Sequence, residues 1–172
     1  DPIVSYYAGS VLTSTGNYQG RNLVAKDYQS SAALDRMYSE YSKELLTIPA
    51  MPEFQFLHSQ KQVYDHLTDQ YFSYSGPTSM GKSFIMRMFL KAQVEDGVEK
   101  NFALIVPTKA LINEVTSKII NDLKENLKER NYRLVTSAGA IVLKEKHNFI
   151  FLLTPERLLY LLISNPDLEL HY

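Results

Sequence analysis

The sequence predicts an α/β fold with a mainly parallel central sheet, preceded by a helical N-terminal segment. From residue 53 onward, short apolar runs alternate with longer segments of helical periodicity, which is typical of strands joined by crossover helices. Residues 102–106 (Phe-Ala-Leu-Ile-Val) are continuously apolar, as expected for a strand buried on both faces. Between residues 25 and 46, tyrosines and leucines instead recur at three- and four-residue steps, which indicates a helix.

Each further element is predicted from a local signal. The prolines of residues 48–52 end the first helix and indicate a linker. Ser59 is a candidate cap for a helix that runs to about Leu67. The helix at 109–130 ends in charges of mixed sign, with leucines four apart, and this pattern favours a solvated outer face. The remaining expected strands are 71–75, 132–136, 140–142 and 148–153, and the remaining expected helices are 82–94 and 155–163.

Composition limits the classes of function. The chain has 172 residues, 45% of them hydrophobic, which suits one packed domain with a small appendage. A formal net charge of −1 gives no overall positive field, so any nucleic-acid site must be a local groove. The longest apolar runs are far shorter than the roughly 20 residues that span a bilayer, so we expect no membrane partner.

Neither cysteine nor histidine indicates a metal site. The chain has no cysteine, which excludes disulfides and thiolate ligands and fits a reducing compartment. The four histidines are scattered, with no two at the spacing of metal ligands. We expect a cytoplasmic protein, or a nuclear one if the source is eukaryotic.

One glycine-containing loop carries a chemical signature. Residues 76–83 (Gly-Pro-Thr-Ser-Met-Gly-Lys-Ser) fit the spacing G-x-x-x-x-G-K-[ST] of a phosphate-binding P-loop. Such a loop aims backbone N–H groups at phosphates from a helix N-terminus, and glycine allows the backbone to approach them. Lys82 is expected to pair with the β- and γ-phosphates, and the Ser83 hydroxyl to ligate Mg²⁺. The residues expected to cradle the phosphates are Gly76, Pro77, Thr78, Ser79, Met80, Gly81, Lys82 and Ser83. The alternative is a chance match, against which the predicted strand–loop–helix context counts.

Three segments together resemble the superfamily 2 helicases, the DExD/H-box group. Residues 76–83 resemble motif I of that family, and their Pro-Thr pair distinguishes them from generic kinases and AAA+ ATPases. Residues 103–111 (Ala-Leu-Ile-Val-Pro-Thr-Lys-Ala-Leu) are similar to motif Ia, and residues 154–158 (Thr-Pro-Glu-Arg-Leu) to motif Ib. The resemblance implies a partial RecA-like domain over 51–172, after a helical N-terminal extension over 1–50 that resembles nothing we can name.

The resemblance also implies a nucleotide base site upstream of the loop. Residues 54–60 resemble the Q-motif region, in which Gln60 would read adenine and Phe54 or Phe56 would stack on the base. An ordinary surface glutamine is the alternative for Gln60, and Gln62 is a near competitor. ATP and Mg²⁺ are therefore the implied cofactors.

The family grips the backbone of one nucleic-acid strand through motifs Ia and Ib. Here this implies a DNA- or RNA-binding face formed by Thr108, Lys109, Thr154 and Arg157, which would position a backbone without reading bases. A salt bridge within its own helix is the alternative role for Arg157. Gly139 loosely resembles the small glycine motif between Ia and Ib.

The sequence departs from the family pattern in two places. Ser79 stands where the family usually has glycine, and Met80 beside it is bulky, so we expect a narrowed or closed loop. No apolar strand ending in Asp-Glu follows the helix that motif Ib opens, and the second RecA-like domain is missing too. We therefore expect a helicase fragment that does not hydrolyse ATP by itself, because hydrolysis needs groups from both domains. Unpaired sheet edges in such a fragment predict self-association.

Two other classes of function remain open. One is a non-hydrolysing module that uses the loop to bind nucleotide or nucleic acid. The other is a different P-loop enzyme, against which the two Pro-Thr pairs and the Thr-Pro-Glu-Arg-Leu segment argue.

Overall fold

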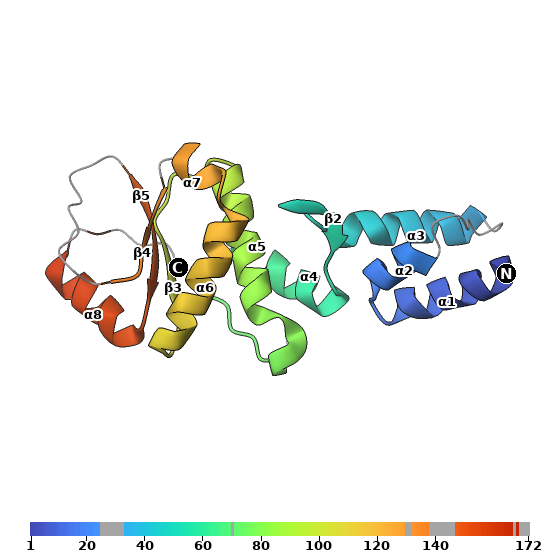
Figure 1. Cartoon of the computed structure of the whole chain (residues 1–172), viewed down its shortest axis with the longest axis horizontal. Coiled ribbons are helices and arrows are strands. Elements are labelled where there is room, and N and C mark those ends of the chain that lie inside the picture. Colours follow the sequence, from blue (N-terminus) through green and yellow to red (C-terminus); the bar gives the residue numbers. More distant parts are fainter. Residues whose placement is uncertain (25–32, 70, 130–131, 138–146, 167, 169–172) are drawn as a thin grey trace. The chain divides into compact units, whose positions relative to one another are not determined.

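The chain forms two compact units, Asp1–Phe89 and Leu90–Tyr172. The computed structural model describes residues 1–24, 33–69, 71–129, 132–137, 147–166 and 168. Figure 1 shows the elements in chain order: α1 (Pro2–Ser14), α2 (Tyr18–Val24), α3 (Ala33–Leu46), β1 (Thr47–Ile48), β2 (Met51–Gln55), α4 (His58–Asp65), the 3₁₀ turn η1 (Thr78–Met80), α5 (Lys82–Glu95), β3 (Phe102–Ile105), α6 (Lys109–Asp122), α7 (Asn126–Glu129), β4 (Tyr132–Val135), β5 (Asn148–Leu153) and α8 (Pro155–Ser164).

The second unit contains the predicted parallel sheet. Its strand order is β3-β5-β4, and both pairs are parallel, with Phe102 and Leu134 opposite Ile150 on either side. The strand buried on both faces is the central β5, whose residues 149–153 are all buried, whereas β3 is only partly buried. The strand predicted at 102–106 is present as β3, but the prediction that it is buried on both faces was wrong. The α/β fold with a parallel sheet is confirmed.

Alternate residues of β5 supply two cores. Ile150 and Leu152 belong to a core with Ile112 and Ile119 of α6, while Phe151 and Leu153 pack with Leu161 of α8 on the other face. This follows from the two-residue period of a strand, which sends successive side chains to opposite faces.

The helix expected over 109–130 is interrupted. α6 ends at Asp122, and a second short helix, α7, begins at Asn126. Leu123 caps α6 and is buried in the core, so this stretch is more than a solvated outer face. The charges at 124 and 125 lie in the turn between the two helices.

The first unit begins with helices and continues into a small hairpin. Residues 33–46 form the expected helix, while 25–32 lie outside the described residues. The segment 48–52 is not a linker, because β1 and β2 pair antiparallel across it and bury Ile48 and Ala50. Ile48, Phe56 and Met88 form a cluster of buried residues in this unit.

Two local predictions near the loop were wrong. Residues 71–75 form no strand: the rings of Phe72 and Tyr74 stack 5.5 Å apart, and Phe72 stacks on His66 at 5.3 Å, so the aromatic side chains pack locally. Ser59 does not cap α4, because Leu57 holds the cap position and the Gln60 side chain accepts its N–H.

Two further predictions stay untested by the fold. The expected strand at 140–142 and Gly139 fall outside the described residues.

Within the described part of the chain, no helix is both long and apolar enough to cross a membrane.

Candidate functional site

The P-loop folds as a tight turn that leads into a helix. Met80 N–H donates to the Pro77 carbonyl at 3.1 Å, which closes the η1 turn. Gly81 then adopts a left-handed conformation, with φ of 77°, and α5 begins at Lys82. A side chain rarely adopts this backbone conformation, so the second glycine of the motif is required by geometry.

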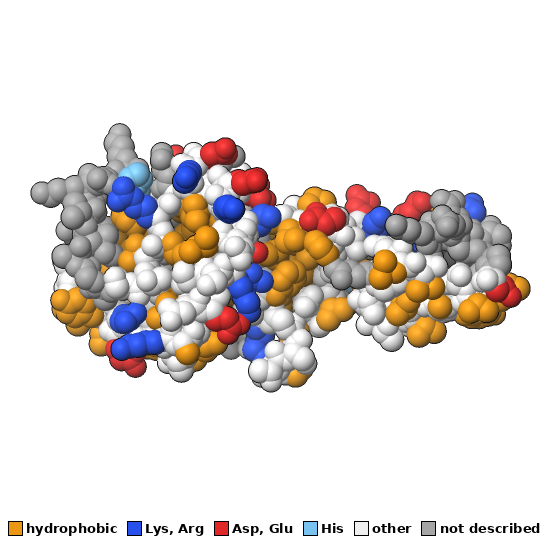
Figure 2. Space-filling view, in the orientation of Figure 1, with side chains coloured by type: hydrophobic (Ala, Val, Ile, Leu, Met, Phe, Trp, Pro, Cys, Tyr) orange, Lys and Arg blue, Asp and Glu red, His pale blue; other side chains and the backbone are white. Residues whose placement is uncertain are grey.

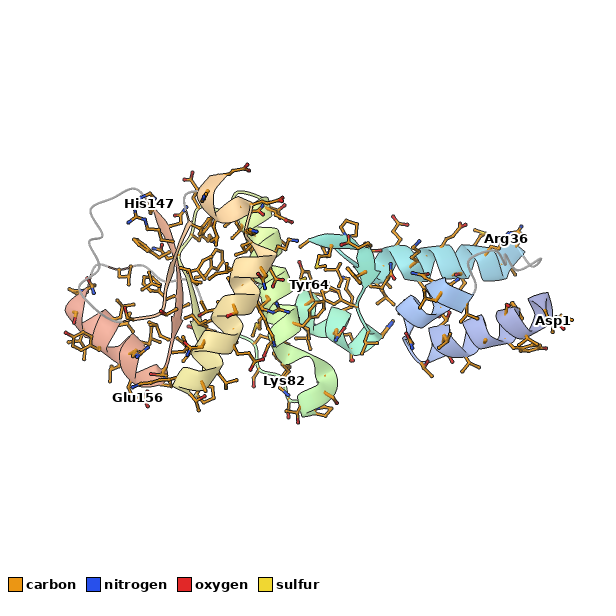
Figure 3. All side chains as sticks on the ribbon, in the orientation of Figure 1. Asp1, Arg36, Tyr64, Lys82, His147 and Glu156 are labelled. Carbon is orange, nitrogen blue, oxygen red and sulfur yellow. The ribbon has the colours of Figure 1, made fainter. Side chains whose placement is uncertain are left out.

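The lysine of the loop is held by the loop itself. Lys82 Nζ donates to the carbonyl of Gly76 at 2.6 Å and to the carbonyl of Pro77 at 3.0 Å. Figure 3 shows Lys82 at the start of α5, where the turn meets the helix. Both acceptors lie five or six residues away in the same loop, so these bonds shape the loop without joining distant elements.

The donors of this loop fit a polyphosphate. The N–H groups of Phe84 and Ile85 donate to the Gly81 carbonyl at 2.9 and 3.1 Å. The N–H groups of Lys82 and Ser83 precede the first intrahelical bonds of α5, and together with the Lys82 ammonium they form a positive set of donors. The Ser83 side chain is exposed. A phosphate oxygen would replace the backbone carbonyls as the acceptor for Lys82 and would make a stronger, charge-assisted bond.

Ser79 and Met80, the two residues of the loop that depart from the family pattern, lie in different surroundings. Met80 Sδ lies 2.3 Å from the point where a Cβ on Gly76 would stand, so the thioether fills the space over the first glycine. Ser79 is exposed. The side chain that narrows the loop in this structure is therefore that of Met80.

Of the residues expected to hold the base, Gln60 contacts the P-loop. Gln60 Oε1 accepts from Leu57 N–H and its Nε2 donates to the Met80 carbonyl, both at 2.9 Å, so this side chain links the start of α4 to the P-loop. Phe56 is fully buried and cannot stack on a ligand, whereas Phe54 is half-buried and lines a cavity of about 340 Å³. Of the two aromatic candidates, only Phe54 can meet a base.

The expected nucleic-acid residues lie at one edge of the second unit's sheet. Thr108 and Thr154 follow β3 and β5, and the carboxyl ends of adjacent parallel strands meet at the same edge. Val106 N–H donates to the Leu153 carbonyl at 2.9 Å, which holds the two strand ends together. Thr108 caps α6 by accepting from Leu111 N–H at 3.3 Å, and Lys109 is exposed.

Motif Ib is more enclosed than motif Ia. Thr154 is 6% exposed, and its hydroxyl donates to the Glu156 carboxylate, which lowers the pKa of Glu156 below its ordinary value. Arg157 Nη1 donates to the Thr136 carbonyl at 2.7 Å, just beyond the end of β4. The guanidinium therefore joins α8 to a neighbouring strand, which neither of the two roles considered from the sequence anticipated.

The turn between α1 and α2 lines a cavity that the sequence did not predict. Gly16, Asn17 and Tyr18 line the same cavity as Phe54. This contact joins residues about 40 positions apart, which periodicity and short motifs do not detect. Within the described residues, no cluster of three or more His, Asp or Glu side chains could hold a metal ion by itself.

Comparison with known proteins identifies the family. Residues 58–171 match the family model of the DEAD/DEAH box helicases, so this chain belongs to that family. The resemblance drawn from the three motifs is confirmed. No curated protein and no solved structure matches the chain.

Proposed function

We propose that this chain carries the ATP phosphate-binding loop and part of the nucleic-acid face of an ATP-dependent helicase or translocase. The observation that carries the proposal is the geometry of residues 76–83, with Lys82 Nζ at hydrogen-bond distance from two loop carbonyls and Gly81 in the left-handed conformation. Membership of the DEAD/DEAH box family supports ATP, Mg²⁺ and nucleic acid as the ligands.

ATP would be held by residues on both sides of the loop. Lys82 would give up the carbonyls of Gly76 and Pro77 for the β- and γ-phosphates, and Ser83 would ligate Mg²⁺. Bound ATP supplies the phosphoanhydride bond whose hydrolysis drives a motor of this class. An amide can accept two bonds and donate two, so Gln60 keeps capacity for adenine while it holds the loop.

Nucleic acid would be gripped through its backbone. Thr108 and Lys109 are exposed at the N-terminus of α6, where a hydroxyl, a positive charge and helix N–H groups suit a phosphate. Thr154 is enclosed, so we propose that motif Ib contributes through the N-terminus of α8 and the position of Arg157. Contacts of this kind bind DNA or RNA without reading sequence.

The proposal includes binding without turnover. The Asp-Glu pair that the family uses for hydrolysis is not among the motifs of these residues, and the motor needs groups from a second domain. A non-hydrolysing nucleotide-binding module gives the same result with these 172 residues.

We also propose that the chain associates with itself. Large apolar side chains are exposed along α1 and α3, including Tyr7, Tyr38 and Tyr41 at 64%, 71% and 63%, and Figure 2 shows hydrophobic side chains at the surface of the unit that contains them. Exposed apolar side chains on this scale favour burial against another molecule. Light scattering is expected to give a mass above that of one chain, and a strictly monomeric mass would contradict this part of the proposal.

A titration tests the central part of the proposal. A fluorescent ATP analogue is added with Mg²⁺ to the wild-type chain and to Lys82→Ala, and phosphate release is followed in parallel. We expect binding to the wild type, at least a hundredfold weaker binding to Lys82→Ala, and turnover in neither. Lys91→Ala, which removes a lysine two turns along the same helix, is the matched control and should bind as the wild type does. Equal binding by Lys82→Ala and the wild type would overturn the P-loop assignment.

A further inference from the structure

A cavity of about 340 Å³ within the Asp1–Phe89 unit is lined by one residue of α5, the helix that follows the P-loop, and by none of residues 76–83. One wall is Phe84, in the first turn of α5, whose Cβ lies 3.8 Å from the point where a Cβ on Gly81 would stand. β2 contributes Met51, Phe54 and Gln55, and the turn between α1 and α2 contributes Tyr18. The cavity therefore joins the start of the phosphate-binding helix to the N-terminal extension.

We propose that this cavity holds the base of the nucleotide and that Tyr18, from the N-terminal extension, forms one of its walls. The inference rests on the proposed function and adds to it a part of the chain, residues 1–24, that the family model does not cover. It makes Tyr18 a residue that determines affinity for the base.

The chemistry of the lining suits a purine. Tyr18, Phe54 and Phe84 supply three aromatic rings, and a base has two apolar faces that stack on such rings. Gln60 does not line this cavity, so in this inference the amide of Gln55, in place of Gln60, supplies the donor and the acceptor for the polar edge of the base. The volume lies at the lower end of the range for small-molecule sites, which fits a base better than a whole nucleotide.

Contacts connect the extension to the phosphate loop. Gly16 has φ of 75°, and Leu57 Cδ2 lies 2.6 Å from the point where a Cβ on Gly16 would stand, so the turn before Tyr18 packs directly on the start of α4. From there, Leu57 N–H bonds to Gln60, and Gln60 bonds to the Met80 carbonyl. The extension thus lies against the same helix start that holds the loop.

The burial of Tyr18 fits a wall rather than a surface residue. Its side chain is half-buried, and burial raises the pKa of its hydroxyl, with Tyr38 adding to the rise and Arg21 opposing it. Tyr7, on the preceding helix, is 64% exposed and does not line the cavity. Tyr18 and Tyr7 therefore form a matched pair for a test.

The test compares ATP with inorganic tripolyphosphate, which has no base. Both are titrated, with Mg²⁺, as competitors of a fluorescent ATP analogue on the full 172-residue chain, using the wild type, Tyr18→Ala, Tyr18→Phe and Tyr7→Ala. We expect Tyr18→Ala to weaken ATP about tenfold and tripolyphosphate not at all, since stacking on one aromatic side chain is worth about this much. Tyr7→Ala should bind both competitors as the wild type does, and Tyr18→Phe, which keeps the aromatic ring, should recover the ATP affinity that Tyr18→Ala loses.

A second variant protects the test against misfolding. Phe54→Leu keeps an apolar side chain in the cavity and leaves the extension unchanged, and it too should weaken ATP and not tripolyphosphate. Unchanged ATP affinity in both Tyr18→Ala and Phe54→Leu, while Lys82→Ala loses binding, would overturn this inference and leave the proposed function standing. Equal weakening of ATP and tripolyphosphate by Tyr18→Ala would also overturn it. Failure of the wild type to bind either competitor would instead overturn the proposed function, and this inference with it.

Discussion

Two cations, one in each compact unit, bond to backbone carbonyls and yet have different roles. Lys82 Nζ donates to Gly76 and Pro77, in its own loop. Arg157 donates to Thr136, which lies 21 residues away and beyond the end of another strand. The first set of bonds closes a loop on itself, whereas the second joins α8 to the sheet.

This difference predicts that Lys82 contributes mainly to ligand binding and Arg157 mainly to the stability of the fold. A ligand can replace the acceptors of Lys82 without disturbing the packing of the unit, because no distant element depends on them. The bond of Arg157 fixes the position of a helix, so its loss is a loss of tertiary structure. We therefore propose that the family motif supplies a binding residue in the first unit and mainly a structural residue in the second.

Removing the Arg157 guanidinium is expected to have the largest effect on stability. Arg157→Ala should lower the free energy of unfolding by about 1.5–3 kcal/mol, the usual range for a hydrogen bond from a charged group. Arg157→Lys restores the charge and should recover part of this loss. Urea unfolding followed by circular dichroism measures both variants, and a stability of Arg157→Ala equal to that of the wild type would remove the contrast with Lys82.

Two glycines with left-handed backbone conformations, Gly81 within the P-loop and Gly97 outside it, form a matched pair for substitution. Gly81 and Gly97 have φ of 77° and 72°, so alanine at either position should cost about 1–2 kcal/mol of stability. Only Gly81→Ala should also weaken ATP, by more than tenfold, because Gln60 Nε2 would lie 3.0 Å from the added Cβ. If Gly97→Ala weakened ATP as much, the effect would belong to general destabilisation.

The exposed cation of motif Ia should affect nucleic-acid binding alone. Lys109→Ala is expected to leave the free energy of unfolding unchanged and to reduce the slope of log K against log salt for single-stranded DNA or RNA by about 0.7, the share of one phosphate contact. Lys124→Ala removes an equally exposed lysine from the turn beyond the same helix and should leave the slope unchanged. Equal slopes for wild type and Lys109→Ala would remove Lys109 from the proposed face.

The smallest expected effect is a pH dependence at motif Ib. The Thr154 hydroxyl and the backbone N–H of Glu156 lower the pKa of the Glu156 carboxyl in the folded chain. The stabilisation is thus present above the unfolded pKa and is lost as pH falls through the lowered folded pKa. Acid titration of stability in wild type and Glu156→Gln should diverge below the ordinary glutamate range, with the wild type losing more. Parallel curves would show that the carboxylate contributes nothing.

The elements that could be predicted from the sequence are those with a repeating residue pattern or a short motif. The period of residues 33–46, the apolar run of β5 and the P-loop spacing each act locally, so each was predictable. The hairpin at 47–55 was missed because its two prolines indicate a linker, while the burial of Ile48 depends on Phe56 and Met88. Burial of Thr154 and the bond from Arg157 to Thr136 were missed for the same reason, since they depend on tertiary contacts that no local pattern encodes.

The central claim is that Lys82 binds nucleotide and does not hold the fold. Thermal unfolding with and without ATP and Mg²⁺, in wild type, Lys82→Ala and Arg157→Ala, tests it most directly. Without ligand, we predict that Lys82→Ala has the same Tm as the wild type and that Arg157→Ala has a lower Tm. With ATP and Mg²⁺, we predict that the Tm of the wild type and of Arg157→Ala rises and that the Tm of Lys82→Ala does not. A rise of equal size in Lys82→Ala, or a large loss of its Tm without ligand, would contradict the account.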